Sequence, residues 1–368
     1  MKEQYGNAGT LYRLGRTAAK AVEKARSQVA ALINAKPEQI IFTSGGTEAN
    51  NLVFFGLQGH LSSIGKKHVI VSAIEHDSVI HAVEELCAKH SFCADLVYPE
   101  ETGVVSAEAV EEELEWGWTS AGLVSVMHTN NETGVQNPVE EIAAICHEHG
   151  VLFHTDCVQA ATHPLDVNQL GCDFLSLSSH KIHGPKGVGA LYVRDTSLLS
   201  PLICGGDEQE FGLRGGTENV AGIVGFGKAC EILKEQREDD EEYTENLCQL
   251  LYERIWDGLF ALGLKDILWL NGDNEDRPSK VLNLGFRGVD SETLVLLLDS
   301  DGLCISAGSA CRSHESEPSR VLTAMGVDAE DARNSVRFSL SRMNTVEEII
   351  EAAQMVVVAV AMLHQSST

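Results

Sequence analysis

The first half of the chain alternates between apolar residues at helical spacing and short, continuous apolar runs. Helical spacing is clearest over residues 17–34, 49–61, 76–90 and 138–150. The runs between and after these segments are rich in β-branched residues and predict strands: QIIFTS, KHVIVSA, AGLVSVMHTN, VLFHTD, FLSLSS and GALYVR. Strands separated by helices predict an α/β fold with a large, mostly parallel sheet and helices on both faces.

A charge-dense stretch, KEQREDDEEY, marks the best candidate for a domain boundary. It follows a helix predicted over about 220–234, and apolar periodicity resumes after it, so we interpret it as a solvated helix face. The later runs KVLNLGF, TLVLLLD and NSVRFSL, with a terminal helix, suggest a smaller α+β domain. We therefore expect a large domain over residues 1–235 and a small one over residues 236–368.

The chain of 368 residues has a formal net charge of −27, with 27 Lys and Arg against 54 Asp and Glu. A surface that acidic repels phosphate backbones and anionic lipids, so we expect neither a nucleic-acid partner nor a membrane partner. No apolar run reaches the roughly 20 residues that a bilayer span requires. The N-terminus also lacks the apolar core of a secretory signal. The resulting expectation is a cytoplasmic location.

The ten cysteines are scattered singly, and no two have the CxxC spacing of a zinc or dithiol site. The sequence therefore predicts no metal site. Most cysteines lie in apolar or helical segments, such as Cys304 in LCIS and Cys230 in GKACEIL, and we expect these to be core residues. Cys311 differs, because it lies in a Gly- and Ser-rich loop, SAGSACRSHESEPS, without an apolar run around it. Exposure there would favour a reactive thiolate.

Polar residues follow the carboxyl ends of five predicted strands, where open α/β sheets bind their ligands. Each has an ordinary structural explanation when taken alone, such as a helix cap, a turn acceptor or a surface lysine. The residues at these ends are Gly45, Gly46, Thr47 and Glu48, then His76, then Asn130 and Asn131, then Asp156, and finally His180 and Lys181.

Taken together, these residues predict a site for pyridoxal phosphate. A glycine pair and Thr47 at the start of a helix offer backbone N–H groups to one phosphate, and neither a Walker loop nor GxGxxG is present. A buried carboxylate at Asp156 needs a cationic partner, for which a protonated pyridine nitrogen is one candidate. Lys181 follows an apolar strand, where a buried amine loses its charge readily and becomes nucleophilic.

Eight longer motifs are distributed along nearly the whole chain and include these strand-end residues. They are, in order, FTSGGTEANN, EHDSV, MHTNNETG, HTDCVQA, SLSSHKIHGPKGVGALYVR, LRGGTENVAGIVG, ISAGSACRSHESEPSRVL and VRFSLSRMNT. Together they resemble the cysteine desulfurases, which belong to the class V, fold-type I pyridoxal-phosphate enzymes. The resemblance implies a large cofactor-binding domain and a smaller C-terminal domain that carries the catalytic-cysteine loop.

The resemblance also implies a role for each matching residue. Lys181 would hold the cofactor covalently, and His76 would stack on its ring and exchange protons during the reaction. Arg337 of VRFSL would bind the substrate carboxylate, a task suited to guanidinium, and Cys311 would be the nucleophile. Asp156 would contact the ring nitrogen, and Asn131 and Gln159 would contact the ring hydroxyl, with Asn131 also facing the substrate. The phosphate would be bound by Gly46, Thr47, Ser178 and His180. Thr217 would reach the same phosphate from the second subunit of a homodimer.

The implied reaction converts L-cysteine to L-alanine. Lys181 would shuttle protons while the cofactor withdraws electrons. The Cys311 thiolate would attack the substrate sulfur, hold it as a persulfide and carry it to an acceptor protein, which requires a mobile loop. The sequence leaves the acceptor open among iron–sulfur cluster assembly, tRNA thiolation, cofactor synthesis and DNA phosphorothioation.

Two features depart from the family pattern. A strand-like segment with Asn-Ala-Thr-Thr usually precedes GNAGTLYRLGR, whereas Met1 stands just before that match here, so we expect either a truncated chain or reduced activity. The glycine-rich run before Gln-Glu is replaced by Gly206-Asp207-Glu208-Gln209-Glu210. The backbone near the expected dimer contact need not follow the family there.

Three other functions compete with this interpretation. A selenocysteine lyase would share the fold and almost the same site, and relative turnover of cysteine and selenocysteine would separate the two. A class V aminotransferase would not need Cys311 and would accept a keto acid. A non-catalytic subunit could keep the fold to dock a sulfur-transfer or DNA-modification partner, and it would release no alanine from L-cysteine.

Overall fold

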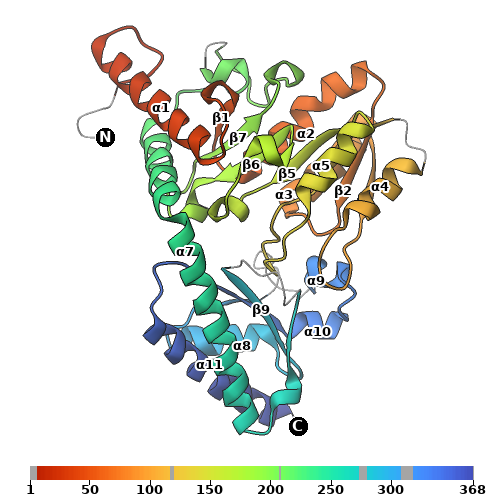
Figure 1. Ribbon diagram of the computed structural model, residues 1–368, viewed down its shortest axis with the longest axis vertical. Coiled ribbons are helices and arrows are strands. Elements are labelled where there is room, and N and C mark those ends of the chain that lie inside the picture. The colour runs from red at the N-terminus through yellow and green to blue at the C-terminus, as the bar shows by residue number, and fades with distance from the viewer. Residues whose placement is uncertain (1–5, 117–119, 207–208, 273–279, 308–317, 368) are drawn as a thin grey trace. The chain divides into compact units, whose positions relative to one another are not determined.

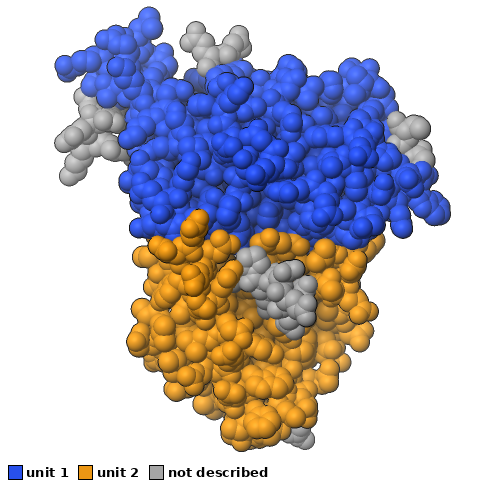
Figure 2. Space-filling view, in the orientation of Figure 1, with its two compact units in different colours: residues 1–97, 105–129, 137–237 blue, residues 98–104, 130–136, 238–368 orange. Residues whose placement is uncertain are grey.

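The computed structural model describes residues 6–116, 120–206, 209–272, 280–307 and 318–367. These residues form two compact units, coloured separately in Figure 2. The larger unit comprises residues 1–97, 105–129 and 137–237, and the smaller comprises 98–104, 130–136 and 238–368. The two short segments, 98–104 and 130–136, extend the smaller unit beyond the residues that the sequence assigned to it.

A seven-stranded sheet lies at the centre of the larger unit (Figure 1). Its strand order is β1-β7-β6-β5-β4-β2-β3, and only β7 runs antiparallel to its neighbours. The expected mostly parallel sheet is thereby confirmed. The strands are β1 (Ile40–Thr43), β2 (His68–Ser72), β3 (Cys93–Val97), β4 (Ala121–Ser125), β5 (Leu152–Asp156), β6 (Phe174–Ser178) and β7 (Gly189–Val193).

The helices of the larger unit bury one apolar face each. In α1, Ala18, Val22, Ala25 and Val29 are buried at intervals of three and four residues, the repeat of a helix face. The helices are α1 (Arg13–Leu32), α2 (Gly46–Ser63), α3 (Asp77–His90), α4 (Ala107–Glu115), α5 (Val139–Glu148) and α6 (Val167–Leu170), with 3-10 turns η1 (Pro37–Gln39), η2 (Ala160–Thr162), η3 (Ser179–Ile182), η4 (Thr196–Leu198) and η5 (Gln209–Gly212).

A single helix, α7 (Val220–Ala261), runs through the expected boundary. The interpretation of the charged stretch as a solvated helix face is confirmed, because the stretch lies within α7 and most of its side chains are exposed; the expected end of a helix near residue 234 was wrong. Charged residues such as Glu, Lys and Arg are good helix formers, so a charge-dense stretch need not interrupt a helix. The contact boundary between the units lies within α7, between residues 237 and 238.

The smaller unit is built on a four-stranded antiparallel sheet of order β10-β11-β9-β8. The run TLVLLLD lies in a helix, α8, whose start is capped by the Asp290 carboxylate accepting from the Thr293 N–H. The strands are β8 (Leu268–Leu270), β9 (Val281–Phe286), β10 (Ser306–Ala307) and β11 (Ser335–Ser339), and the helices are α8 (Ser291–Ser300), α9 (Arg320–Ala324), α10 (Ala329–Arg333), α11 (Val346–Ser367) and the turn η6 (Lys265–Ile267).

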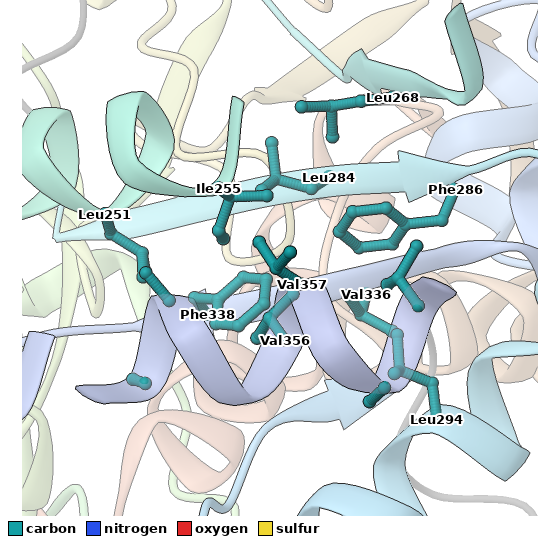
Figure 3. Close-up of a cluster of buried hydrophobic side chains, with 14 of the residues drawn as sticks. Leu251, Ile255, Leu268, Leu284, Phe286, Leu294, Val336, Phe338, Val356 and Val357 are labelled. Atoms are coloured by element: carbon teal, nitrogen blue, oxygen red, sulfur yellow. The ribbon is translucent and has the colours of Figure 1, made fainter. Parts of the chain in front are cut away.

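The core of the smaller unit lies between this sheet and helices α7, α8 and α11. Figure 3 shows Phe286 and Phe338 directed toward aliphatic side chains such as Ile255 and Val356. Phe286 and Ile255 are fully buried. In the described part of the chain, no helix is both long and apolar enough to cross a membrane.

We predict that Phe286→Ala will destabilise the protein strongly. Removing this buried ring leaves a cavity, and such truncations cost about 3–5 kcal/mol in free energy of unfolding. Phe260→Ala is a matched control, because Phe260 is 58% exposed and surface changes cost within about 0.5 kcal/mol. Urea unfolding followed by circular dichroism measures both variants, and equal midpoints for the two would contradict the assigned core.

Candidate active site

The shared direction of five strands brings the candidate residues of the larger unit to one edge of its sheet. β1 is antiparallel to β7, which is antiparallel to β6, so β1 points the same way as β2, β4, β5 and β6. Their carboxyl ends therefore coincide. Gly46 follows β1, His76 follows β2, Asp156 ends β5, and Lys181 follows β6.

The start of α2 forms the candidate phosphate cradle. A Cβ on Gly46 would lie 2.7 Å from Val158 Cγ2 and 3.8 Å from Ser178 Cβ, so only glycine fits this position without displacement. The helix has Gly45 as its N-cap and thus no capping side chain. Its first N–H groups, together with the positive end of the helix dipole, suit an anion next to the exposed Thr47.

Ser178 and His180 extend the cradle from the end of β6. Ser178 is buried, and its Oγ lies 2.9 Å from His180 Nδ1. Burial and the charges of Lys181 and Lys186 lower the pKa of His180, which favours its neutral ring. Lys181 is half-buried within η3.

A chain of hydrogen bonds joins Asp156 to His76. The Asn50 Nδ2 donates to Asp156 Oδ2 at 2.8 Å and to Ser78 Oγ at 2.9 Å. Ser78 Oγ in turn lies 2.8 Å from His76 Nδ1, which also accepts from the Ser78 N–H. Because that N–H donates to Nδ1, the proton of the neutral ring is on Nε2. His76 itself is exposed at the start of α3.

The environment of Asp156 matches a cationic ligand. Burial raises the pKa of Asp156, and it outweighs the hydrogen bonds from Asn50 and the Val158 N–H and the charges of His76 and Lys181. A raised pKa means that the protein alone undercompensates the buried negative charge. A protonated pyridine nitrogen would supply the missing cation, so these residues fit pyridoxal phosphate.

Gln159 and Thr217 are the other expected cofactor residues of the larger unit. Gln159 is buried and precedes η2, three residues after Asp156. Thr217 is exposed. Three residues before it, Arg214 pairs with Glu48 in the first turn of α2, with Nε 2.9 Å from Oε1.

The expected substrate residues lie in the smaller unit. Arg337, on β11, donates from Nη1 to the carbonyl of Asn131 at 2.9 Å. Its Nε is buried and has no hydrogen-bond partner within the described residues. A half-buried guanidinium with an unused N–H suits an anionic ligand such as a carboxylate.

Five of the described cysteines are buried, Cys87 is half-buried and three are exposed, while Cys311 lies outside the described residues. Cys304 is exposed, so the expectation that it is a core residue was wrong; its Sγ lies 3.5 Å from Asp299 Oδ1. Burial raises the thiol pKa of Cys172 to about 12 and also raises that of Cys146 and Cys230. Such buried thiols are inert nucleophiles.

Glu210 explains part of the departure from the family's glycine-rich run. Its carboxylate accepts from both terminal nitrogens of Arg26 at 2.8 Å and from the Phe42 N–H at 2.7 Å. Glu210 and Phe211 have φ values of 42° and 58°, the left-handed region that favours glycine. The buried ion pair holds this strained turn, while Asp207 and Glu208 lie outside the described residues.

Sequence reasoning missed two polar residues that organise the site, Asn50 and Ser78, and it named Glu48 without assigning it a partner. Asn50 and Ser78 link Asp156 to His76, and Glu48 binds Arg214 and the Ser44 N–H. Burial opposes ionisation of Glu48, but its hydrogen bonds with Arg214 and Ser44 outweigh burial and lower its pKa. The motif GGTEANN contained a usable signal, since Asn50 lies four residues after Gly46 on the same helix face.

Among the residues that the structure describes, no cluster of His, Cys, Asp and Glu side chains could hold a metal ion. The groups at the larger unit's sheet edge instead suit a ligand that is an organic anion with a cationic ring.

Comparison with known proteins places the chain in a family. A family model described as aminotransferase class-V matches residues 1–351. The chain is 41% identical to cysteine desulfurase IscS of Dictyoglomus turgidum over 357 residues, which is 95% of this chain and 86% of that protein. It is 42% identical to the mitochondrial cysteine desulfurase of Arabidopsis thaliana over 368 residues, 99% of this chain and 78% of that one.

A solved structure titled NifS-like protein matches with a TM-score of 0.87 and 33% identity, covering 98% of this chain and 93% of that structure. The likeness extends over both units, so it does not reflect the larger sheet alone. These similarities confirm the resemblance that the eight motifs indicate. The chain therefore belongs to the class-V aminotransferase family and, within it, to the cysteine desulfurases.

Proposed function

We propose that this protein is a pyridoxal-phosphate-dependent cysteine desulfurase that converts L-cysteine to L-alanine. The observation that carries the proposal is the buried Asp156 carboxylate, with its raised pKa, at the same sheet edge as Lys181 and the Gly46 cradle. Relatives named cysteine desulfurase at about 40% identity over most of the chain support the choice of substrate.

The cofactor would be held by the residues already described. Gly46, Thr47, Ser178 and His180 would bind its phosphate, Asp156 its ring nitrogen, and Gln159 and Asn131 its ring hydroxyl. When bound, pyridoxal phosphate supplies an electron sink for the substrate α-carbon.

The chain's own groups would perform the remaining steps. Arg337 would bind the substrate carboxylate, and the Lys181 amine, once freed from the cofactor by the incoming substrate, would remove and return protons. The Cys311 thiolate would attack the substrate sulfur as the C–S bond breaks, which leaves a persulfide on Cys311 and L-alanine as product. His76 would exchange protons through Nε2, because its Nδ1 is occupied by the Ser78 N–H.

A homodimer and a cytoplasmic location complete the proposal. Thr217 is exposed, and the nearby side chains of Ile203 and Phe211 are 40% and 51% exposed. Ile203 pairs with Arg214 through a backbone bridge, so apolar surface borders the segment that carries Thr217. Such a border suits a second copy that receives Thr217 as a phosphate ligand. The sulfur acceptor stays open, with iron–sulfur cluster assembly one candidate pathway.

The first test concerns Lys181. The holoenzyme should be yellow, and borohydride should bleach it and fix the cofactor to the Lys181 peptide, as mass spectrometry of a digest would show. Lys181→Ala should lower alanine release by roughly a thousandfold, because the acid–base amine is lost. Lys228→Ala, at an exposed lysine on α7 in the larger unit, should behave like wild type. The same reduced adduct in Lys181→Ala would exclude the assignment.

The second test separates sulfur transfer from other chemistry. Cys311→Ala should keep the cofactor and still bind L-cysteine, but it should release alanine at least about a hundredfold more slowly, because the nucleophile is absent. Cys304→Ala is the control, since Cys304 is also exposed and should retain the wild-type rate. Persulfide labelling on Cys304, or unchanged turnover in Cys311→Ala, would reassign the nucleophile. Activity retained on selenocysteine alone would favour the lyase.

The third test is the mass of the holoenzyme in solution. Light scattering should give about twice the 39.8 kDa of one chain. Thr217→Ala should leave this mass unchanged and weaken cofactor retention, because one phosphate ligand is lost. A monomer that keeps its cofactor would rule out the donation of Thr217 across an interface.

A further inference from the structure

Glu132, a buried carboxylate in the smaller unit, has no role in the reaction described above. Ser319 Oγ donates to Glu132 Oε2 at 2.5 Å, and the two residues are only 2% and 9% exposed. A buried carboxylate is costly unless it is well hydrogen-bonded, and an apolar residue of similar size would avoid the cost. Its presence therefore calls for a reason beyond packing.

Asn130 closes the turn that contains Glu132 from within. Asn130 Oδ1 already accepts from the N–H groups of Glu132 and Thr133, at 2.8 and 3.0 Å, and from Thr133 Oγ1 at 3.3 Å. The Gly134 N–H also donates to the Asn130 carbonyl. The Glu132 carboxylate instead reaches out of the turn to Ser319, 187 residues later in the chain.

The backbone on either side of Glu132 leads to the candidate substrate clamp. The carbonyl of Asn131 accepts from Arg337 Nη1 at 2.9 Å, and the carbonyl of Glu132 accepts from Asn283 Nδ2 at 3.0 Å. Asn283 on β9 is the register partner of Arg337 on β11. The backbone around Glu132 is thus bonded both to Arg337 and to its register partner.

Ser319 also caps a helix of the smaller unit. It caps α9, where its Oγ accepts from the Leu322 N–H at 3.2 Å. On β10, Ser306 pairs with Arg337 itself. Ser306 therefore pairs with Arg337 directly, and Ser319 binds Glu132, whose neighbour Asn131 binds Arg337.

We propose that Glu132 is a positioning residue that fixes the substrate-binding orientation of Arg337. Its carboxylate, held by Ser319, keeps the Asn131 carbonyl in place, and this carbonyl fixes one end of the guanidinium while the buried Nε is left for the substrate carboxylate. The inference rests on the proposed function only for the identity of the substrate.

The experiment compares variants of the holoenzyme in two assays. The first measures KM and kcat for L-cysteine, and the second measures equilibrium binding of L-alanine through the cofactor absorbance, which requires no turnover. Glu132→Ala should raise KM and the L-alanine Kd by roughly tenfold each, within the range of coupling between contacting residues. Glu132→Gln should stay within about threefold of wild type, because its amide oxygen can still accept from Ser319.

Two serine variants separate positioning from loss of a helix cap. Ser319→Ala should weaken L-alanine binding in the same direction as Glu132→Ala, and the double variant should be no worse than Glu132→Ala. Ser106→Ala is the matched control: Ser106 caps α4 in the larger unit by accepting from the Ala109 N–H at 3.3 Å. It should leave both assays unchanged.

Unchanged KM and L-alanine affinity in a folded Glu132→Ala variant would overturn the proposal. If Glu132→Ala fails to fold, the L-alanine affinities of Ser319→Ala and Ser106→Ala are compared instead. Equal affinities in these two variants would also overturn the proposal. Failure of the proposed function has a different result: wild type would release no alanine from L-cysteine, while the L-alanine binding series would still report on Glu132.

Discussion

The buried carboxylate of Asp156 is the group around which the larger unit's site is organised. It ends β5 in the middle of the sheet, where burial raises its pKa. The protein offers two neutral donors, Asn50 and the Val158 N–H, and these orient the carboxylate without neutralising it. Asn50 also binds Ser78, which fixes His76. The Asp156 carboxylate and the His76 imidazole therefore belong to one hydrogen-bond network.

Much of this arrangement could be predicted from the sequence because buried parallel strands have a strong signal. β1, β5 and β6 are buried at every or nearly every position, and polar residues at their ends stand out against apolar runs. β3 was missed because it is an edge strand in which only Val97 is buried. The run TLVLLLD is apolar without periodicity, so only the Asp290 cap distinguishes the helix from a strand.

The site was less predictable wherever its residues act through distant partners. Asn50 is separated from Asp156 by 106 positions, and Arg337 from Asn131 by 206. No local pattern encodes such pairs, so the role of Arg337 came only from the family resemblance. Cys304 was misjudged for the opposite reason: its apolar neighbours suggested a core, but the residue lies just before the short strand β10 and is exposed.

Buried carboxylates recur wherever a segment near the candidate site must be held in place. Glu48 binds Arg214, Glu210 binds Arg26, and Glu132 binds Ser319, each across more than 160 positions of the chain. Buried apolar residues next to two of these partners, Leu213 beside Arg214 and Val321 near Ser319, add packing to the hydrogen bonds. Removing one partner of a buried charged pair typically costs about 3–5 kcal/mol, whereas small apolar changes at a surface cost far less. Hydrogen bonds to a buried charge are directional, so they fix the positions of these segments more narrowly than packing alone does. Reactions that need aligned guanidinium and imidazole groups depend on such fixed positions.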